Sequence, residues 1–282
     1  MRIARTLTEL RTACASLRAD FGGLAFVPTM GALHEGHKTL VREAVASGVP
    51  AVASIFVNPL QFAANEDLSR YPRDEAGDLA ALEACGCSLA WLPDVATMYP
   101  AGEATTVHVS GPAERWEGDA RPGHFRGVAT VCTKLFGQVR PDRAYFGEKD
   151  WQQLQVIKRV VADLLLPLAI VGVPTVREAD GLAMSSRNRY LNATERATAP
   201  ALYRVLGSVA GMLADGRVAE PVLAAARAEL AAAGFAVDYL ALVDGPTLAP
   251  IAAVAPTEAA GARLIATAKL GPVRLLDNVG VG

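Results

Sequence analysis

The sequence predicts an α/β fold in which a doubly wound parallel sheet of the Rossmann type is followed by a second, smaller α+β domain. In the first part of the 282-residue chain, apolar runs of strand length alternate with segments of helical periodicity. This pattern is typical of parallel strands joined by crossover helices. The run 51–57 is almost continuously apolar, as expected for a strand buried on both faces. The composition changes after Asn188, and we therefore predict one domain over residues 1–175 and a second over residues 176–282.

The first domain is predicted to begin with a helix whose start is marked by Thr6 and Glu9, which have the spacing of a capping box. The spacing of apolar residues predicts the later elements. The predicted strands lie at 24–28, 51–57, 88–92, 144–147 and 168–173. The predicted helices between them lie at 35–47, 74–85, 128–139 and 150–165. The apolar faces assigned to four of the helices are Leu7, Leu10, Ala13, Cys14 and Leu17; Leu40, Val41, Ala44 and Val45; Val128, Val131, Cys132, Leu135, Phe136 and Val139; and Leu154, Ile157, Val161, Leu164 and Leu165.

The second domain is predicted from an Ala-rich helical stretch at 200–234 and three strand-like runs at 237–243, 262–269 and 273–276. Gly245 and Pro246 mark a turn after the first of these runs. The segment 250–262 is interpreted as a connection.

Composition argues against several classes of protein. The net charge of −2 and the pI near 6.1 do not provide the basic face that nucleic-acid binding requires. The four cysteines include no C-x-x-C pair, so we expect reduced thiols and a cytoplasmic protein. The arginines near the N-terminus lie in a segment interpreted as an ordinary helix rather than a transit peptide. No segment has the length and hydropathy of a transmembrane helix, and no membrane contact is predicted.

The segment 28–37 contains the main candidate functional residues. His34 and His37 lie at the junction of a predicted buried strand and a helix, where backbone N–H groups and the helix dipole favour phosphates. Gly31 and Gly36 let the backbone approach a ligand closely. Positions i and i+3 share a helix face, so both imidazoles can point at one polyphosphate. Taken alone, a buried histidine is more often structural.

A second motif, Met184-Ser185-Ser186-Arg187-Asn188, follows about 150 residues later. The first motif resembles the HIGH motif of the adenylate-forming nucleotidyltransferase superfamily. The second resembles its KMSKS-type loop, with Arg187 as the cation. The two motifs in this order are more specific than either alone.

Nearly the whole chain resembles the pantothenate synthetase family of pantoate–β-alanine ligases. The matching blocks are 28–37, 55–62, 71–73, 121–128, 146–150 with 152–154, and 174–188. The resemblance implies that ATP activates pantoate as pantoyl adenylate with release of pyrophosphate, and that β-alanine then displaces AMP. It also implies a cytoplasmic homodimer with ATP, pantoate and β-alanine as its small-molecule partners.

The resemblance also implies site residues. The catalytic group is His34, His37, Lys149 and Arg187, and the acid for the leaving group is His37. The ATP-binding group is Met30, Gly31, Ala32, Leu33, His34, Glu35, Gly36, His37, Gly147, Glu148, Lys149, Asp150, Val176, Met184, Ser185, Ser186 and Arg187. The residues expected to bind pantoate or β-alanine are Asn58, Gln61 and Gln153, because a neutral amide can both donate and accept.

Simpler interpretations compete for several of these residues. Gln153 could be a solvated helix residue, Asn58 could belong only to a turn, and the 148–150 segment could be a charged helix cap. Arg121 and His124 could lie on a surface loop. Two positions depart from the family pattern: Lys38 stands where an apolar residue is usual, and Trp151 replaces a tyrosine.

No protein metal site is predicted. Asp74, Glu75 and Asp78 could suggest one, but exposed acids in the first turn of a helix are the simpler interpretation. Mg²⁺ is expected to be carried by the phosphates of ATP.

Two other functions remain open. One is another HIGH-motif nucleotidyltransferase that acts on a small acid, and the other is a nucleotide-binding regulator without activity. For the ligase, we expect the 176–187 segment to be mobile without nucleotide and the second domain to act as a lid.

Overall fold

The computed structural model describes residues 1–62, 68, 71–254 and 261–282, which form two compact units. Unit 1 comprises Met1–Glu148 and Val156–Pro174, and unit 2 comprises Lys149–Gln155 and Thr175–Gly282. The segment Lys149–Gln155, which the sequence analysis placed in the first domain, therefore groups with the second unit. Within the described residues, no helix is both long and apolar enough to cross a membrane.

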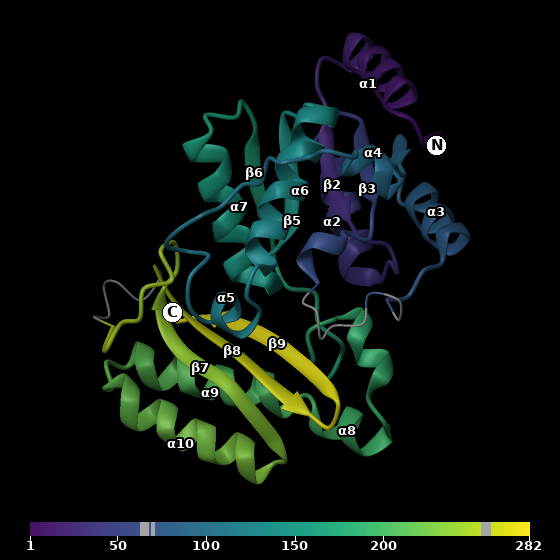
Figure 1. Cartoon of the computed structure of the whole chain (residues 1–282). Helices are drawn as coiled ribbons and strands as arrows, with labels where there is room; N and C mark the ends of the chain where they lie inside the picture. Colours follow the sequence, from purple (N-terminus) through teal and green to yellow (C-terminus); the bar gives the residue numbers. More distant parts are fainter. Residues whose placement is uncertain (63–67, 69–70, 255–260) are drawn as a thin grey trace. The chain divides into compact units, whose positions relative to one another are not determined.

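Unit 1 is built on a six-stranded sheet with the strand order β1-β4-β3-β2-β5-β6, and every neighbouring pair is parallel (Figure 1). The strands are β1 (Arg2–Ala4), β2 (Ala25–Thr29), β3 (Ala51–Ile55), β4 (Leu89–Trp91), β5 (Arg143–Gly147) and β6 (Ala169–Val173). Five of them match predicted strands. The edge strand β1 was missed because three residues are too short to show a period of two.

Helices cover both faces of this sheet, which confirms the doubly wound architecture. Right-handed crossovers place α1 (Leu7–Phe21), α6 (His124–Val139) and α7 (Trp151–Asp163) on one face. They place α2 (Glu35–Ala46) and α3 (Glu75–Ala84) on the other. The shorter helices are α4 (Val95–Met98) and α5 (Glu117–Ala120), with 3₁₀ turns at Pro59–Gln61 and Glu148–Asp150. The predicted capping box of Thr6 and Glu9 is present at the start of α1.

Two predicted apolar faces need correction. Val45 is 37 % exposed, and its neighbour Gly86 has no side chain that could cover it. Helix α7 ends at Asp163, so Leu164 and Leu165 lie outside it and are exposed. Leu165 adopts a left-handed φ of 51°, and the N–H of Leu166 reaches back to the carbonyl of Val161. This is a Schellman ending, which apolar periodicity does not reveal.

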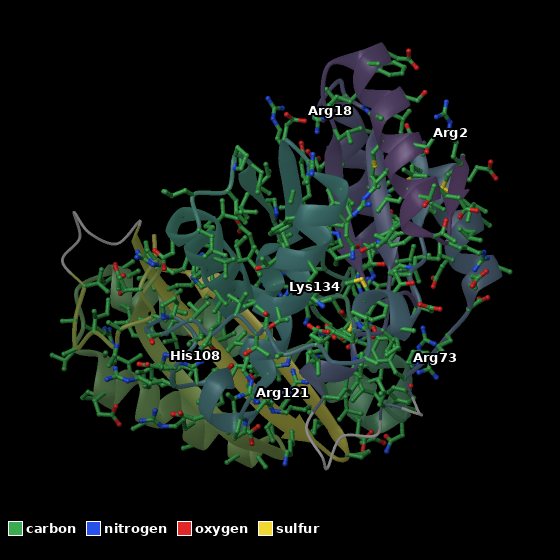
Figure 2. The ribbon with its side chains drawn as sticks, turned by 45° about the horizontal axis from the view of Figure 1, so that its top comes forward. Arg2, Arg18, Arg73, His108, Arg121 and Lys134 are labelled. Carbon is green, nitrogen blue, oxygen red and sulfur yellow. The ribbon has the colours of Figure 1, made fainter. Side chains whose placement is uncertain are left out.

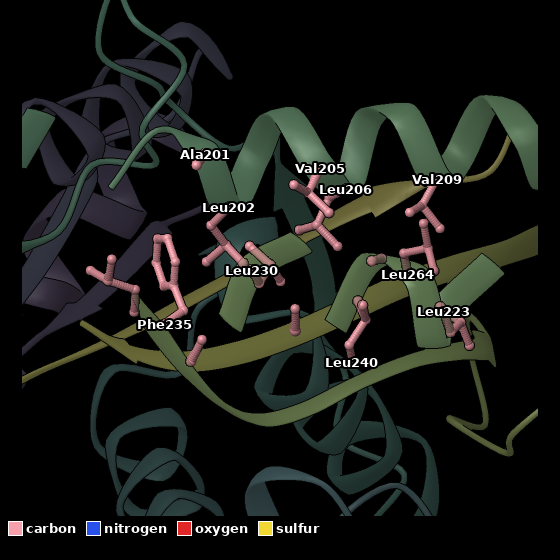
Figure 3. Close-up of a cluster of buried hydrophobic side chains, with 14 of the residues drawn as sticks. Ala201, Leu202, Val205, Leu206, Val209, Leu223, Leu230, Phe235, Leu240 and Leu264 are labelled. Carbon is pink, nitrogen blue, oxygen red and sulfur yellow. The ribbon is translucent and has the colours of Figure 1, made fainter. Parts of the chain in front are cut away.

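Unit 2 contains a three-stranded antiparallel sheet, β7-β8-β9, formed by Phe235–Asp244, Ala262–Leu270 and Val273–Gly280. Helices α8 (Ala193–Thr198), α9 (Ala201–Ala214) and α10 (Ala219–Ala232) precede it. The predicted helical stretch 200–234 is two helices, since Gly216 turns the chain with a φ of 80°. Side chains of α9 and α10 pack on the sheet to form the core of the unit (Figure 3).

Strand β9 continues four residues beyond the predicted run. Its last part contains Asp277 and Asn278, whose polar side chains interrupted the apolar pattern in the sequence. Both are nevertheless buried.

Candidate functional site

The first motif lies at the point in unit 1 where the sheet connections change direction. Strands β2 and β5 are neighbours, but α2 leaves β2 toward one face and α7 leaves β5 toward the other. In open α/β sheets, ligands bind beyond the carboxyl ends of the strands at such a switch point. The residues that follow these ends are Met30 after β2 and Glu148 after β5.

The loop between β2 and α2 has two consecutive residues with left-handed backbone. Gly31 has a φ of 79° and Ala32 has a φ of 51°. The backbone N–H groups of Ala32 and Leu33 donate to the carboxylate of Asp78, at 2.9 and 2.7 Å. The prediction that Asp78 is an exposed acid is therefore wrong, and its role was not predicted from the sequence. A carboxylate four residues after the helix cap has the same local sequence whether it points outward or toward another loop.

His34 and His37 cap the helix that they begin. His34 is the N-cap residue of α2, and its Nδ1 accepts from the N–H of Gly36 at 3.1 Å. The N–H of His34 donates to Nδ1 of His37 at 3.4 Å, which completes a capping box made of two imidazoles. Their ring centroids are 4.1 Å apart. Because each Nδ1 accepts, a neutral ring carries its proton on Nε2 and donates from there.

The first turn of α2 also contains charged side chains that pair with one another. Glu35 pairs with Arg42 and lies 3.9 Å from Lys38. Its hydrogen bond with Arg42 lowers the pKa of the Glu35 carboxyl. Lys38, the departure from the family pattern, is half-exposed. Its aliphatic stem can pack while its ammonium reaches Glu35.

Asn58 is 1 % exposed, and both ends of its amide are engaged within unit 1. Its Oδ1 accepts from the Tyr99 hydroxyl at 2.6 Å, and its Nδ2 donates to Oε1 of Gln61 and to the carbonyl of Gly127, both at 3.1 Å. Burial, followed by the charge of Glu103, raises the pKa of Tyr99, so its hydroxyl stays protonated as a donor. Asn58 therefore orients Gln61 in this structure.

Gln61 is also held through its backbone. Arg121 and His124 both contact the Gln61 carbonyl oxygen, at 3.1 and 2.9 Å (Arg121 is labelled in Figure 2). A Cβ on Gly127 would stand 2.2 Å from the carbonyl oxygen of Leu60, so only glycine allows this close approach. The blocks 55–62 and 121–128 thus meet around Gln61. Arg121 and His124 lie on this contact rather than on an exposed loop.

In unit 2, Asp277 and Asn278 of β9 bind the two segments that contain the predicted cations, Lys149 and Arg187. The Nδ2 of Asn278 donates to the carbonyl of Lys149 at 2.8 Å. Asp277, 3 % exposed, forms a bidentate pair with Arg177, at 2.6 and 2.9 Å. Arg177 also lies 3.6 Å from the ring centroid of Tyr203. The contacts of Asp277 and Asn278 could not be predicted from the sequence, because their partners lie 100 or more positions away.

The 176–184 segment forms a tight hairpin. The N–H of Met184 donates to the carbonyl of Val176, and the N–H of Glu178 donates to the carbonyl of Leu182. The Ser185-Ser186-Arg187 motif follows on a 3₁₀ turn at Ser186–Tyr190, capped by Ser185. The predicted mobility of residues 176–187 stays a prediction. Because these hydrogen bonds hold residues 176–184 together, we expect the mobility to be largest in the residues after Met184.

Gln153 lies half-buried in the first turn of α7, two residues after Trp151. Trp151 donates its indole N–H to the carbonyl of Gly245 at 2.8 Å, and Arg263 stacks over its ring at 3.4 Å. The tryptophan that replaces the usual tyrosine thus anchors the start of α7 within unit 2.

Replacing Arg177 with alanine is expected to destabilise the protein by about 3–5 kcal/mol, because it leaves the buried Asp277 carboxylate without its cation. Urea unfolding measures this. The matched control is Arg196→Ala, which breaks a half-exposed pair with Asp180 and should cost about 1 kcal/mol or less. Equal losses in the two variants would contradict the anchoring role of Arg177.

The comparisons with known proteins agree on one family. The family model described as pantoate-beta-alanine ligase matches residues 2–280. A pantothenate synthetase of Granulibacter bethesdensis is 60 % identical over 280 residues, which are 99 % of this chain and 97 % of that protein. One from Acidiphilium cryptum is also 60 % identical, over the full length of both chains.

Solved structures show the same likeness. The crystal structure of pantothenate synthetase from Thermus thermophilus has a TM-score of 0.92 and 49 % identity, covering 100 % of this chain and 99 % of that one. The pantoate-beta-alanine ligase from Francisella tularensis, complexed with beta-gamma ATP and beta-alanine, has a TM-score of 0.83 and 30 % identity. That match covers 100 % of this chain and 98 % of the other.

Proposed function

Because the chain belongs to the pantoate–β-alanine ligase family, we propose that it joins pantoate to β-alanine and cleaves ATP to AMP and pyrophosphate. The observation that carries this proposal is the imidazole pair that caps α2 at the switch point of the sheet. The N-terminus of α2 and two Nε2 donors suit a polyphosphate.

In the first step, a pantoate carboxylate oxygen attacks the α-phosphorus of ATP and the bond to the bridging oxygen of pyrophosphate breaks. Negative charge grows on the departing pyrophosphate. His34 and His37 are proposed to donate from Nε2 to these oxygens, and Lys149, Ser185, Ser186 and Arg187 supply further donors and cations. Fixed donors of this kind act where charge develops.

The capping geometry favours hydrogen-bond donation by His37 over transfer of a proton. Protonating Nδ1 would turn it into a donor facing the N–H of His34. The neutral ring keeps that bond and still presents Nε2–H. His37 is therefore proposed to stabilise the negative charge of pyrophosphate, which is an adequate leaving group once its charge is paired with donors and cations.

In the second step, the neutral amine of β-alanine attacks the acyl carbon of pantoyl adenylate, and AMP leaves as its phosphate oxygen takes the bonding electrons. The amine nitrogen gives up one proton to the solvent as it becomes the amide. Gln61 and Gln153 are proposed to hold the pantoate hydroxyl and carboxylate groups. Asn58, proposed from the sequence as a direct ligand, is better placed to support Gln61, because its own amide is engaged.

The remaining nucleotide contacts are proposals from the family pattern. They are Met30, Gly31, Glu35, Gly36, Gly147, Glu148, Asp150, Val176 and Met184. Ala32 and Leu33 belong to the same motif, but their N–H groups donate to Asp78. We therefore expect them to contribute shape rather than phosphate hydrogen bonds.

Mg²⁺ is proposed to arrive on the ATP phosphates. Among the residues that the structure describes, no three His, Cys, Asp or Glu side chains gather as metal ligands. Phosphate oxygens and water are the ligands that Mg²⁺ prefers.

The cellular setting and assembly are also proposals. Cys14, Cys87 and Cys132 are free and buried, and burial raises their thiol pKa values, to about 11 for the first two and about 12 for Cys132. Unreactive thiols of this kind suit a reducing cytoplasm. The family resemblance suggests a homodimer, which light scattering would test.

The function is tested by measuring AMP and pantothenate with ATP, pantoate and β-alanine, against reactions in which other small hydroxy acids replace pantoate. The proposal expects product only with pantoate and β-alanine together. Faster AMP formation with another acid would favour a different nucleotidyltransferase. Binding of ATP without turnover would favour a regulator.

Replacing Gln61 with alanine is expected to raise the KM for pantoate far more than the KM for ATP. An unpaired polar group of the bound acid costs roughly 1–3 kcal/mol, or about 5- to 150-fold in KM. Gln153→Ala should act in the same direction. Steady-state kinetics with each substrate varied in turn provides the measurement.

The matched control is Gln138→Ala, which removes another half-buried glutamine of unit 1 that accepts from the indole of Trp91 at 3.0 Å. It should leave the pantoate KM unchanged. A shift in the ATP KM alone for Gln61→Ala would mean that the two substrates had been assigned to the wrong residues.

A further inference from the structure

Asp78 is a buried carboxylate whose two oxygens accept from the same loop. It lies in the first turn of α3 and is 4 % exposed. Its Oδ2 accepts from the N–H of Ala32 at 2.9 Å, and its Oδ1 accepts from the N–H of Leu33 at 2.7 Å. Burying a carboxylate is costly unless its charge is compensated by hydrogen bonds, and bonds to an ionised acceptor are the strong ones.

The loop that Asp78 holds is one that does not form readily by itself. A left-handed conformation costs a non-glycine residue roughly 1–2 kcal/mol, and Ala32 adopts it directly after Gly31. A Cβ on Gly31 would stand 2.7 Å from Asp78 Oδ2 and 3.2 Å from Ile55 Cγ2. The glycine therefore makes room for the carboxylate, and the carboxylate fixes the turn.

This turn determines where the imidazoles stand. Leu33 is adjacent to His34, the residue that begins α2, and His34 in turn binds His37 through the capping box. A change in the direction of the Leu33 N–H would therefore move both rings. Because Ala32 and Leu33 donate to Asp78, these two amides are not the phosphate donors that a loop at a helix N-terminus usually provides.

We propose that Asp78 is a positioning residue for adenylate formation, which sets the loop before α2 so that His34 and His37 stand at the reacting phosphates. This inference rests on the proposed function, because it takes the two imidazoles to contact ATP. A displacement of about 1 Å at reacting groups can cost about 10²-fold in rate.

The test begins with Asp78→Asn, which keeps the size of the side chain but places an NH₂ group against one of the two backbone N–H groups. We expect the rate constant for pantoate-dependent pyrophosphate release to fall about 10²-fold, with little change in the KM for pantoate. Glu75→Gln is the matched control. Glu75 is an acid of the same helical turn that pairs with Arg5 at the surface, and its variant should keep the wild-type rate.

A double-mutant cycle separates positioning from a general loss of structure. Because Asp78 is proposed to act through both imidazoles, Asp78→Asn should cost less on the His37→Ala background than it costs alone, and the remaining loss is the part that acts through His34. A wild-type rate for Asp78→Asn in a folded protein would overturn the proposal. Full additivity on the His37→Ala background would overturn it too.

The wild-type protein provides a second measurement that does not depend on the variant's folding. The amide protons of Ala32 and Leu33 should be strongly protected from hydrogen exchange. Exchange at the rate of an open loop would mean that the two bonds to Asp78 do not form. Hydrogen exchange at these two amides can be measured without ligase activity. An absence of wild-type turnover would contradict the proposed function, but it would not change the conclusion about the loop geometry.

Discussion

Replacing Lys149 with alanine is expected to slow pantoate-dependent pyrophosphate release by about 10²–10³-fold, the usual cost of removing one fixed group that stabilises developing charge. Lys149 is the second residue after β5, and its carbonyl is held by Asn278 at 2.8 Å. Its side chain is largely buried and lies 3.9 Å from Asp150. Since the anchor is a backbone contact, the variant should keep its fold and lose only the ammonium group. Rapid-quench measurement of pyrophosphate gives the rate.

Two further variants define the role of Lys149. Lys149→Arg keeps the charge but replaces a compact ammonium with a planar guanidinium, so it should retain only part of the wild-type rate. Lys158→Ala, at an exposed position farther along α7, should behave as the wild type. A near-wild-type rate in Lys149→Ala would remove this residue from the reaction.

His37→Ala is expected to cause a loss of similar size, about 10²–10³-fold. The reason is the loss of the Nε2 donor, since Nδ1 is occupied by the N–H of His34. Glutamine can place an amide N–H near the position of Nε2, whereas asparagine places its amide near Nδ1. His37→Gln should therefore recover more of the rate than His37→Asn.

The control for this series is His108→Ala, which removes an exposed histidine of unit 1 outside the two motifs (Figure 2). It should leave the rate unchanged. A rate recovered by asparagine and not by glutamine would show that His37 acts through Nδ1, and the capping geometry would then not describe the working enzyme.

The sequence predicted the elements whose formation depends on local pattern. Strand β3 appears in the sequence as a continuous apolar run because both of its faces are buried. The capping box at Thr6 and the apolar face of α6 follow from spacing alone. The six matching blocks in their order identified the family, and the match over residues 2–280 confirms it.

The parts that were missed depend on contacts between distant residues. Asp78 and the neighbouring Glu75 are both acids in the first turn of α3, but one is buried and the other exposed. Nothing in the local sequence distinguishes them, because the difference is made by a loop 45 residues earlier. The same holds for Asp277, whose burial depends on Arg177.

Isotope exchange between labelled pyrophosphate and ATP tests whether the chain activates pantoate as an adenylate before β-alanine reacts. Label is expected to enter ATP when pantoate is present and β-alanine is absent, and pantothenate and AMP are expected to form only when β-alanine is added. Exchange that requires β-alanine, or formation of ADP and phosphate in place of AMP and pyrophosphate, would contradict this mechanism.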